Sequence, residues 1–314
     1  MSAMPALHRI RNSRLHPCGW YWLMYLLPAL AVYAVFMAWP LLSSIQLSLY
    51  TGNQANRSFV GLDNFKKLFA GGEISTRYWG AFWHTWVFFA VHMGVQNVLG
   101  ILFAAMLTNR TMKGRLFYQT IIFLPTTFAV LVTGYLWKLL LNPLWSRAAL
   151  NPLGLSFLAR PWLGESSSAL IAVSLVSCWQ WLGIPTMMFV AALRNISEDL
   201  LEAADIEGCS SIQTFWYIKL PLIKSVAGMV AILTFVSNFN AFDAVYALET
   251  VNGGPNYATD IIGTLFYRVG IAGQHPVGIP DQGLGAAIAV ITFIVLAAFV
   301  IPTLRLTQSK EAQL

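Results

Sequence analysis

Six apolar stretches, each of about 20 residues or more, run through this chain of 314 residues. A helix needs about 20 mostly apolar residues to cross the hydrocarbon core of a bilayer. Since a backbone in lipid must satisfy its own hydrogen bonds, these stretches predict membrane-spanning helices. They cover residues 20–42, 81–107, 117–141, 169–193, 225–247 and 284–304.

The composition agrees with an all-α integral membrane protein. Hydrophobic residues make up 57% of the chain, charged residues only 10%, and the mean hydropathy is +0.62. These values exclude a soluble domain of this length. The formal net charge of +6 comes without a basic patch interleaved with aromatic residues, so nucleic acid is not an expected partner.

The distribution of Lys and Arg predicts the orientation of the spans. An even number of spans places both ends of the chain on the same side. With the N-terminus in the cytoplasm, eleven of the 19 Lys and Arg residues lie in cytoplasmic segments and the other eight lie outside. We therefore expect a cytoplasmic tail at 1–19, a membrane domain at 20–304 and a second cytoplasmic tail at 305–314. The first apolar run is too long for a cleaved signal peptide, which makes it a retained span.

A polar segment at 195–221, between the fourth and fifth spans, predicts a cytoplasmic helical elbow. Ser197 suits an N-cap position, and the acids that follow it suit the first helical turn. Gly208 can take the left-handed conformation that ends the helix, and Ser210 can cap a second one. Pro221 fits the first turn of the following span. From these features alone, a structured loop without a partner is an equal alternative.

The spacing within this segment resembles a known signature. Glu-Ala-Ala, three residues, Gly, nine residues and Ile-x-Leu-Pro form the signature loop of membrane subunits of binding-protein-dependent ATP-binding-cassette (ABC) importers. The resemblance implies that this loop, and 202–221 in particular, couples the permease to an ATPase. The matching residues are Glu202, Ala203, Ala204, Gly208, Ile218, Leu220 and Pro221.

Shorter phrases resemble the carbohydrate-type permeases of this class, those for maltose and glycerol-3-phosphate. They are the Gly-Leu-x-Asn-Phe phrase at 61–65, Phe-Leu-Pro at 123–125, Leu-Asn-Pro at 141–143, and Gly-Gly-Pro at 253–255 with Thr259. The resemblance implies a multi-pass subunit of a prokaryotic plasma (inner) membrane. Its implied partners are a second, similar permease, two cytoplasmic ATPase subunits and an external sugar-binding protein. The chain has no Gly-x-x-x-x-Gly-Lys-[Ser/Thr] phosphate loop, so we expect ATP hydrolysis on a partner chain, no enzymatic activity here and no cofactor.

Polar and aromatic residues interrupt the fourth and fifth spans at the same depth. At about 1.5 Å per residue, Trp179 lies roughly 22 Å from Arg194, and Asn238 lies roughly 21 Å from Lys224. Both therefore reach a level somewhat outward of the middle of a core about 30 Å thick. A substrate pocket could open there.

In maltose-type relatives the sugar is held by the fourth and fifth spans, and the resemblance carries that role to matching positions here. Trp179 offers a flat face to a sugar ring, Gly183 leaves space, and the carboxylate of Asp243 argues against an anionic sugar phosphate. Alternatively, Asn238 and Asn240 only hold helices together, a use worth about 1 kcal/mol or less. The expected substrate path consists of Trp179, Leu182, Gly183, Thr186, Thr234, Asn238, Ala241 and Asp243.

Other functions have less support. A secondary transporter would need several buried charges or a repeated half, and Asp243 is the only carboxylate within an expected span. An ABC permease for a solute other than sugar remains an alternative. His84 and His92 in the second span are more simply packed histidines than a proton relay, and their spacing does not suit a metal-dependent membrane enzyme. The three cysteines are too dispersed for a disulfide framework or a metal site.

Overall fold

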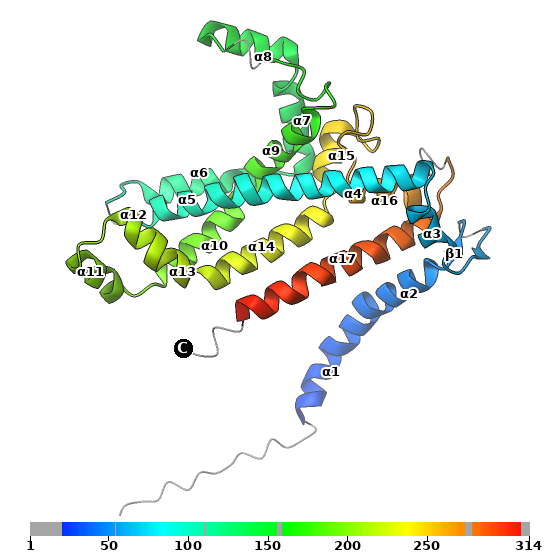
Figure 1. Ribbon diagram of the computed structural model, residues 1–314, viewed down its shortest axis with the longest axis horizontal. Helices are drawn as coiled ribbons and strands as arrows, with labels where there is room; N and C mark the ends of the chain where they lie inside the picture. The colour runs from blue at the N-terminus through cyan, green and yellow to red at the C-terminus, as the bar shows by residue number, and fades with distance from the viewer. Residues whose placement is uncertain (1–20, 54, 110, 156–158, 274–277, 309–314) are drawn as a thin grey trace, which may run out of the picture. The chain divides into compact units, whose positions relative to one another are not determined.

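The computed structural model describes residues 21–53, 55–109, 111–155, 159–273 and 278–308. Helices make up most of the described chain, and two short strands form its sheet (Figure 1). The chain divides into two compact units, 1–46 and 47–314.

The first unit consists mainly of one apolar helix. Helix α1 (Tyr21–Tyr33) continues through the π-helical turn η1 (Ala34–Ala38) into α2 (Trp39–Leu47). The segment Met24–Leu47 is long and apolar enough to span a membrane. Its large apolar side chains are exposed, as expected for a helix surrounded by lipid or by a neighbouring subunit.

The second unit begins with a small motif of two strands and a helix. Strands β1 (Tyr50–Thr51) and β2 (Ser58–Phe59) pair antiparallel, and α3 (Asp63–Phe69) follows. Asn64 Nδ2 donates hydrogen bonds to the carbonyls of Ser48, at 2.9 Å, and Tyr50, at 2.5 Å, which holds α3 against the first strand.

The second span is one continuous helix. It comprises α4 (Glu73–Val91), the π-helical segment η2 (His92–Asn97) and α5 (Val98–Leu107), and it runs for 35 residues. A π-helical segment accommodates an extra residue and is often found at functional sites. The bulge here brings polar residues into the middle of an otherwise apolar span.

The third expected span is strongly bent. Helix α6 (Arg115–Phe123) and the 3-10 turn η3 (Leu124–Thr127) form one arm, and α7 (Val130–Leu140) forms the other, at 99°. The backbone is extended at Phe128, and Gln180 Nε2 donates to its freed carbonyl at 3.1 Å. This bond is the kind of compensation that a broken helix needs at membrane depth. Helix α8 (Pro143–Leu150) and the 3-10 turn η4 (Asn151–Leu153) follow.

The fourth and fifth spans are also interrupted. Helices α9 (Ala169–Trp181) and α10 (Gly183–Arg194) meet at 46°. Helix α14 (Lys224–Phe239) ends earlier than the expected span, and α15 (Asp243–Glu249) begins after a short non-helical link. Asn238 and Asn240 donate to backbone carbonyls one turn back, at 2.6 and 2.9 Å. Such bonds compete with helix continuation and account for the early end.

The remaining elements complete the unit. The elbow between the fourth and fifth spans consists of α11 (Glu198–Ile206), α12 (Ser211–Thr214), the π-helical η6 (Phe215–Lys219) and α13 (Leu220–Leu222). The C-terminal part consists of α16 (Ile262–Tyr267), the π-helical η7 (Arg268–Ala272) and α17 (Gln282–Gln308). Among the described residues, three continuous helices and three bent pairs allow up to six spans, which confirms the expected fold class. The third bent pair consists of the elbow helices α12 to α13 and helix α14, which meet at 69°.

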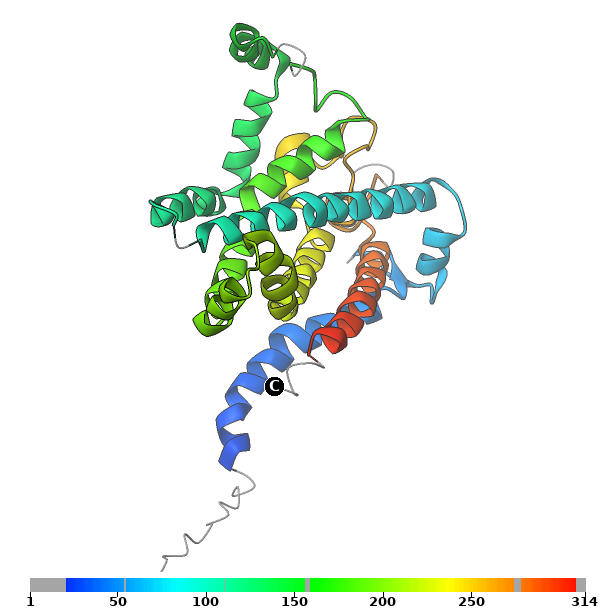
Figure 2. The ribbon, with the colours of Figure 1, turned by 60° about the vertical axis from the view of Figure 1, so that its left-hand side comes forward.

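One of the hydrophobic clusters of this unit is rich in aromatic residues and lies where α14 packs against α4 and α17. Phe235 of α14 stacks on Phe299 of α17 with 3.8 Å between ring centroids, and it contacts Phe89 of α4 edge-on. Helices α11 and α12 lie at one end of the unit, and α3 and β1 lie at the other (Figure 1). Figure 2 shows the same elements turned by 60°.

Candidate functional site

A cavity of about 360 Å³ opens where the interrupted spans meet. Its walls come from α4 with η2, from α9 with α10, and from α14 with the link and α15; Val130 at the start of α7 also lines it. Each of these elements breaks or bulges at the cavity, so polar groups occur there among apolar helices. The cavity therefore depends on the same interruptions that shorten the spans.

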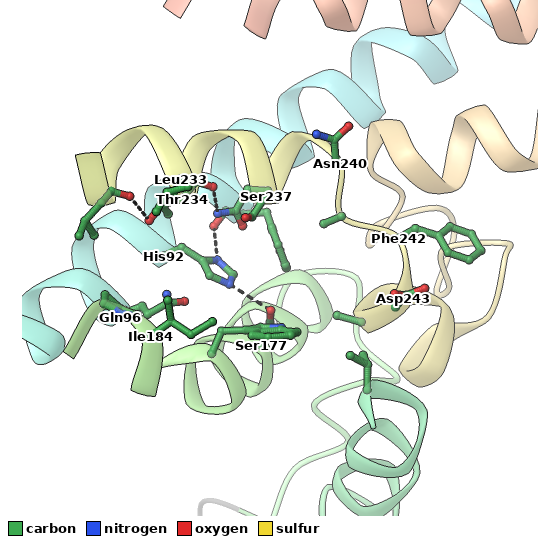
Figure 3. A pocket seen from close by; sticks show the side chains of 18 of the residues that line it. His92, Gln96, Ser177, Ile184, Leu233, Thr234, Ser237, Asn240, Phe242 and Asp243 are labelled. Carbon is green, nitrogen blue, oxygen red and sulfur yellow. Dashed lines mark hydrogen bonds between the residues drawn. The ribbon is translucent and has the colours of Figure 1, made fainter. Parts of the chain in front are cut away.

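One wall of the cavity is a chain of hydrogen bonds that begins in the second span. His92 Nδ1 lies 2.8 Å from the carbonyl of Phe88, and its Nε2 lies 3.1 Å from Ser177 Oγ of α9. His92 and Ser177 face each other across the two helices in Figure 3. His92 therefore pairs with a hydroxyl and a carbonyl. Among the described residues there is no cluster of His, Cys, Asp and Glu side chains that could hold a metal ion.

A second set of bonds joins the second and fifth spans. Asn97 Nδ2 donates to Thr234 Oγ1 at 3.0 Å, and Thr234 Oγ1 donates to the carbonyl of Val230 at 2.8 Å. Asn238 Nδ2 donates to the carbonyl of Thr234 at 2.6 Å. These side chains are buried, so the bonds stabilise the helix contact and position the polar face of α14. Thr234 and Asn238 thus both hold the helices together and line the cavity.

The fifth-span residues expected from the sequence meet in this cavity. Thr234, Asn238, Ala241 and Asp243 all line it. Asp243 is exposed at the start of α15. Asn240, for which the sequence also allowed a helix-packing role, lines the cavity too. Phe242 is a further lining residue, and both are labelled in Figure 3.

The fourth-span residues expected from the sequence lie elsewhere. Trp179 packs edge-on against Trp137 of α7 with 5.4 Å between ring centroids. Leu182 lies at the bend between α9 and α10, and Thr186 is buried and donates to the carbonyl of Leu182. A Cβ atom on Gly183 would approach within 2.9 Å of Phe123 Cα, so this glycine allows helices to pack closely.

Other fourth-span residues and three second-span residues line the cavity instead. From the sequence, His92 is a packing residue, with a proton relay or a metal site as less favoured alternatives, and Gln96 has no predicted role. The polar phrase from His92 to Asn97 within an apolar span was the available signal. The additional lining residues from the second and fourth spans are Phe88, His92, Gln96, Ser177, Trp181, Ile184, Pro185 and Met188.

The elbow forms much as its sequence indicated. Gly208 has a φ of 78°, and Ser210 and Gln213 form a reciprocal capping box at the start of α12. Ser197 occupies the N-cap position of α11, but its side chain makes no capping hydrogen bond, contrary to expectation. The two acids in the first turn are thus the residues that favour this helix terminus.

The elbow exposes apolar residues around its turn. Ala204 is buried against its own unit, whereas Glu202 and Ala203 are exposed. Ile218 and Leu220 are half-buried, and Pro221 lies in the first turn of α13. The large exposed apolar side chains of the elbow are Leu200, Ile206, Ile212, Trp216, Tyr217 and Leu222.

The sequence and fold are similar to those of known transport proteins. The chain is 31% identical to the multiple sugar-binding transport system permease protein MsmF of Streptococcus mutans, over 93% of this chain and 96% of that protein. It is 30% identical to the trehalose/maltose transport system permease protein MalF of Thermococcus litoralis, over 90% of this chain and 92% of that protein.

A solved structure supports the fold. A chain of a bacterial ABC transporter involved in the import of the acidic polysaccharide alginate superposes with a TM-score of 0.77 at 21% identity, covering 93% of this chain and 96% of that one. Residues 96–307, which include the cavity's fourth- and fifth-span walls and the whole elbow, match a family of membrane transport components. The chain belongs to this family, the inner membrane components of binding-protein-dependent transport systems.

Proposed function

We propose that this chain forms half of the translocation pathway of an ATP-driven sugar importer. The observation that carries the proposal is the polar cavity among interrupted helices, because a helix that faces only lipid has no use for buried amide, hydroxyl and imidazole groups. The relatives named for multiple sugars and for trehalose and maltose support a carbohydrate as the solute.

The cavity suits a sugar chemically. Its apolar lining, which includes Trp181 and Phe242, can contact the C–H face of a pyranose ring, while its amides and hydroxyls can bond the ring's hydroxyl groups. In a pathway formed by two subunits, each half of the cavity is expected to be open on the side that faces the other subunit. A second, similar permease would supply the opposite wall.

The elbow is the proposed contact with an ATPase. Its exposed apolar residues surround the turn at Gly208, and the segment joins the two helices that end at the cavity. Closure of the two ATPase subunits would move α10 and α14 together through this lever. Glu202 and Ala203, exposed on α11, would lie at the contact. ATP hydrolysis then belongs to the partner chains.

Sidedness follows from the same assignment. The elbow and both ends of the chain would lie in the cytoplasm, and α3 with β1, at the opposite end of the second unit, would lie outside (Figure 1). An external sugar-binding protein would deliver its ligand on that outer side.

The test is reconstitution of the whole importer. The chain is co-expressed with a second permease, an ATPase and a sugar-binding protein of the same organism, and uptake of a panel of labelled sugars is measured in proteoliposomes with and without internal ATP. We expect ATP-dependent uptake of at least one sugar. Uptake driven by an ion gradient without ATP would favour a secondary transporter, and ATP-dependent uptake restricted to amino acids or ions would favour a non-sugar permease.

A further inference from the structure

Gln96 carries a buried acceptor with no partner. The residue lies in η2 and is 6% exposed, and its side-chain oxygen Oε1 has no hydrogen-bond partner among the described residues. Buried polar groups in native structures are nearly always paired, so each exception requires an explanation. Gln96 also lines the cavity, so a ligand in that cavity is a candidate partner for its side-chain amide.

The backbone around Gln96 supports a functional role. The residue belongs to a π-helical segment, and such segments cluster at functional sites because the extra residue changes the direction of the side chains. His92, one turn earlier, is fully engaged with Phe88 and Ser177. The second span thus presents one paired and one unpaired polar group to the same cavity, as Figure 3 shows.

Other groups of the cavity also accept hydrogen bonds. Asn238 Nδ2 donates to the carbonyl of Thr234. The amide oxygen of Asn238 can therefore accept a hydrogen bond from another group. Helix α14 ends at the cavity, and the C-terminal end of a helix carries a partial negative charge. Asp243 adds a carboxylate.

Cations are missing from this wall. Within the described parts of the chain, no Lys or Arg lines the cavity, while one carboxylate does. A sugar acid or sugar phosphate placed there would meet acceptors and negative charge without a compensating cation, and such pairing is strongly unfavourable away from bulk water. A hydroxyl or ammonium group, by contrast, would donate to Gln96 and Asp243.

We propose that Gln96 and Asp243 make this half of the cavity selective for neutral or amine-bearing sugars and exclude sugars that carry a carboxylate or phosphate. The inference rests on the proposed sugar importer and adds its charge selectivity. Gln96 is the specificity-determining acceptor for a donor group of the sugar, and Asp243 repels anions. A site built to accept a hydrogen bond discriminates strongly against a ligand that lacks the donor.

The experiment uses the assembled importer in nanodiscs without its binding protein, so that only the membrane cavity is probed. Equilibrium dialysis measures the affinities of three disaccharides of similar size: maltose, which is neutral, the glucosamine disaccharide of chitosan, which is cationic, and digalacturonate, which is anionic. We expect wild-type protein to bind digalacturonate about tenfold or more weakly than the other two.

Variants separate the two residues. Gln96→Leu is expected to weaken maltose binding about tenfold, and Gln96→Glu to retain maltose while weakening digalacturonate further. Asp243→Asn should reduce the difference in affinity between digalacturonate and maltose. Gln119→Leu is the matched control, since it makes the same substitution in α6 outside the cavity lining, and it should leave all three affinities unchanged.

The outcomes distinguish this inference from the proposed function. Equal binding of digalacturonate and maltose by wild-type protein, or unchanged affinities in both Gln96 variants, would overturn the charge selectivity and leave the sugar importer standing. Failure of wild-type protein to bind any of the three disaccharides, together with no ATP-dependent sugar uptake, would overturn the proposed function and this inference with it.

Discussion

Arg268 and Asp260 form a buried ion pair with 2.5 Å between Arg268 Nη2 and Asp260 Oδ2. Arg268 Nη1 also donates to the carbonyl of Val251 at 2.9 Å, and Thr264 Oγ1 donates to Asp260 Oδ1 at 2.6 Å. His84 Nδ1 lies 3.0 Å from the Asp260 carbonyl. Arg268, the first residue of η7, therefore holds the Gly-Gly-Pro turn between α15 and α16 in place through its bonds to Val251 and Asp260.

Loss of one partner of this pair should destabilise the protein strongly. Arg268→Ala leaves a buried carboxylate unpaired, and removal of one partner of a buried ion pair typically costs about 3–5 kcal/mol. We expect a clear drop in melting temperature by scanning fluorimetry in nanodiscs. The double variant Arg268→Leu with Asp260→Leu should show a smaller drop in melting temperature than Arg268→Ala alone. An unchanged melting temperature in the single variant would contradict a structural role for the pair.

A side chain at Gly208 should uncouple transport from ATP hydrolysis. The residue has a φ of 78°, a conformation that costs a β-branched residue energy, so Gly208→Val should distort the turn between α11 and α12. The expected result is normal membrane insertion with sugar uptake reduced to background. Gly164→Val, in the segment before α9 and away from the elbow, is the control. Full uptake by Gly208→Val would rule out the coupling role.

Single cysteines should report the sidedness of the chain. In a variant whose native cysteines, including Cys209 in the elbow, are replaced by serine, Ser210→Cys should react with an impermeant maleimide only from the cytoplasm. Asn256→Cys, in the turn between α15 and α16, should react only from outside. Labelling in right-side-out and inverted vesicles measures both, and a reversed pattern would overturn the assigned orientation.

Two neighbouring tryptophans should behave differently in transport. Trp181 lines the cavity, whereas Trp179 packs against Trp137. Trp181→Ala should raise the KM for sugar uptake about tenfold by removing an apolar face for the ring. Trp179→Ala should lower the melting temperature with a smaller change in KM. If only Trp179→Ala changes the KM, the substrate path runs past Trp179, as the sequence predicted, and the cavity lined by Trp181 is not the sugar site.

Glu249 should make stability depend on pH. It ends α15 beyond the fifth span, and burial raises the pKa of its carboxyl from 4.5 to about 7, against the opposing effect of Lys138. A carboxyl whose pKa rises on folding favours the folded state below its unfolded pKa, and this contribution is lost as pH rises toward the folded value. Between about pH 5 and about pH 8 the melting temperature should fall more for wild type than for Glu249→Gln. Glu73→Gln, at an exposed first-turn position, should follow wild type.

The sequence by itself determined the class of the protein. Long apolar runs in a chain with few charges leave membrane helices as the physical solution, and the fixed spacing around Glu202 and Gly208 predicted the elbow together with its left-handed glycine. The capping box at Ser210 was predictable as well, because such signals depend on residues close together in the chain. Local chemistry was sufficient for each of these features.

The tertiary structure decided which residues share the cavity. Trp179 and Trp181 differ by two positions, and only the packing of α9 against α7 turned the first toward Trp137 and the second toward the cavity. Likewise, no local signal shows that Gln96 would lie near Asn238 with its oxygen unpaired. Depth along a helix follows from counting residues, but the direction in which a side chain points depends on bends, bulges and neighbouring helices that lie far apart in the sequence.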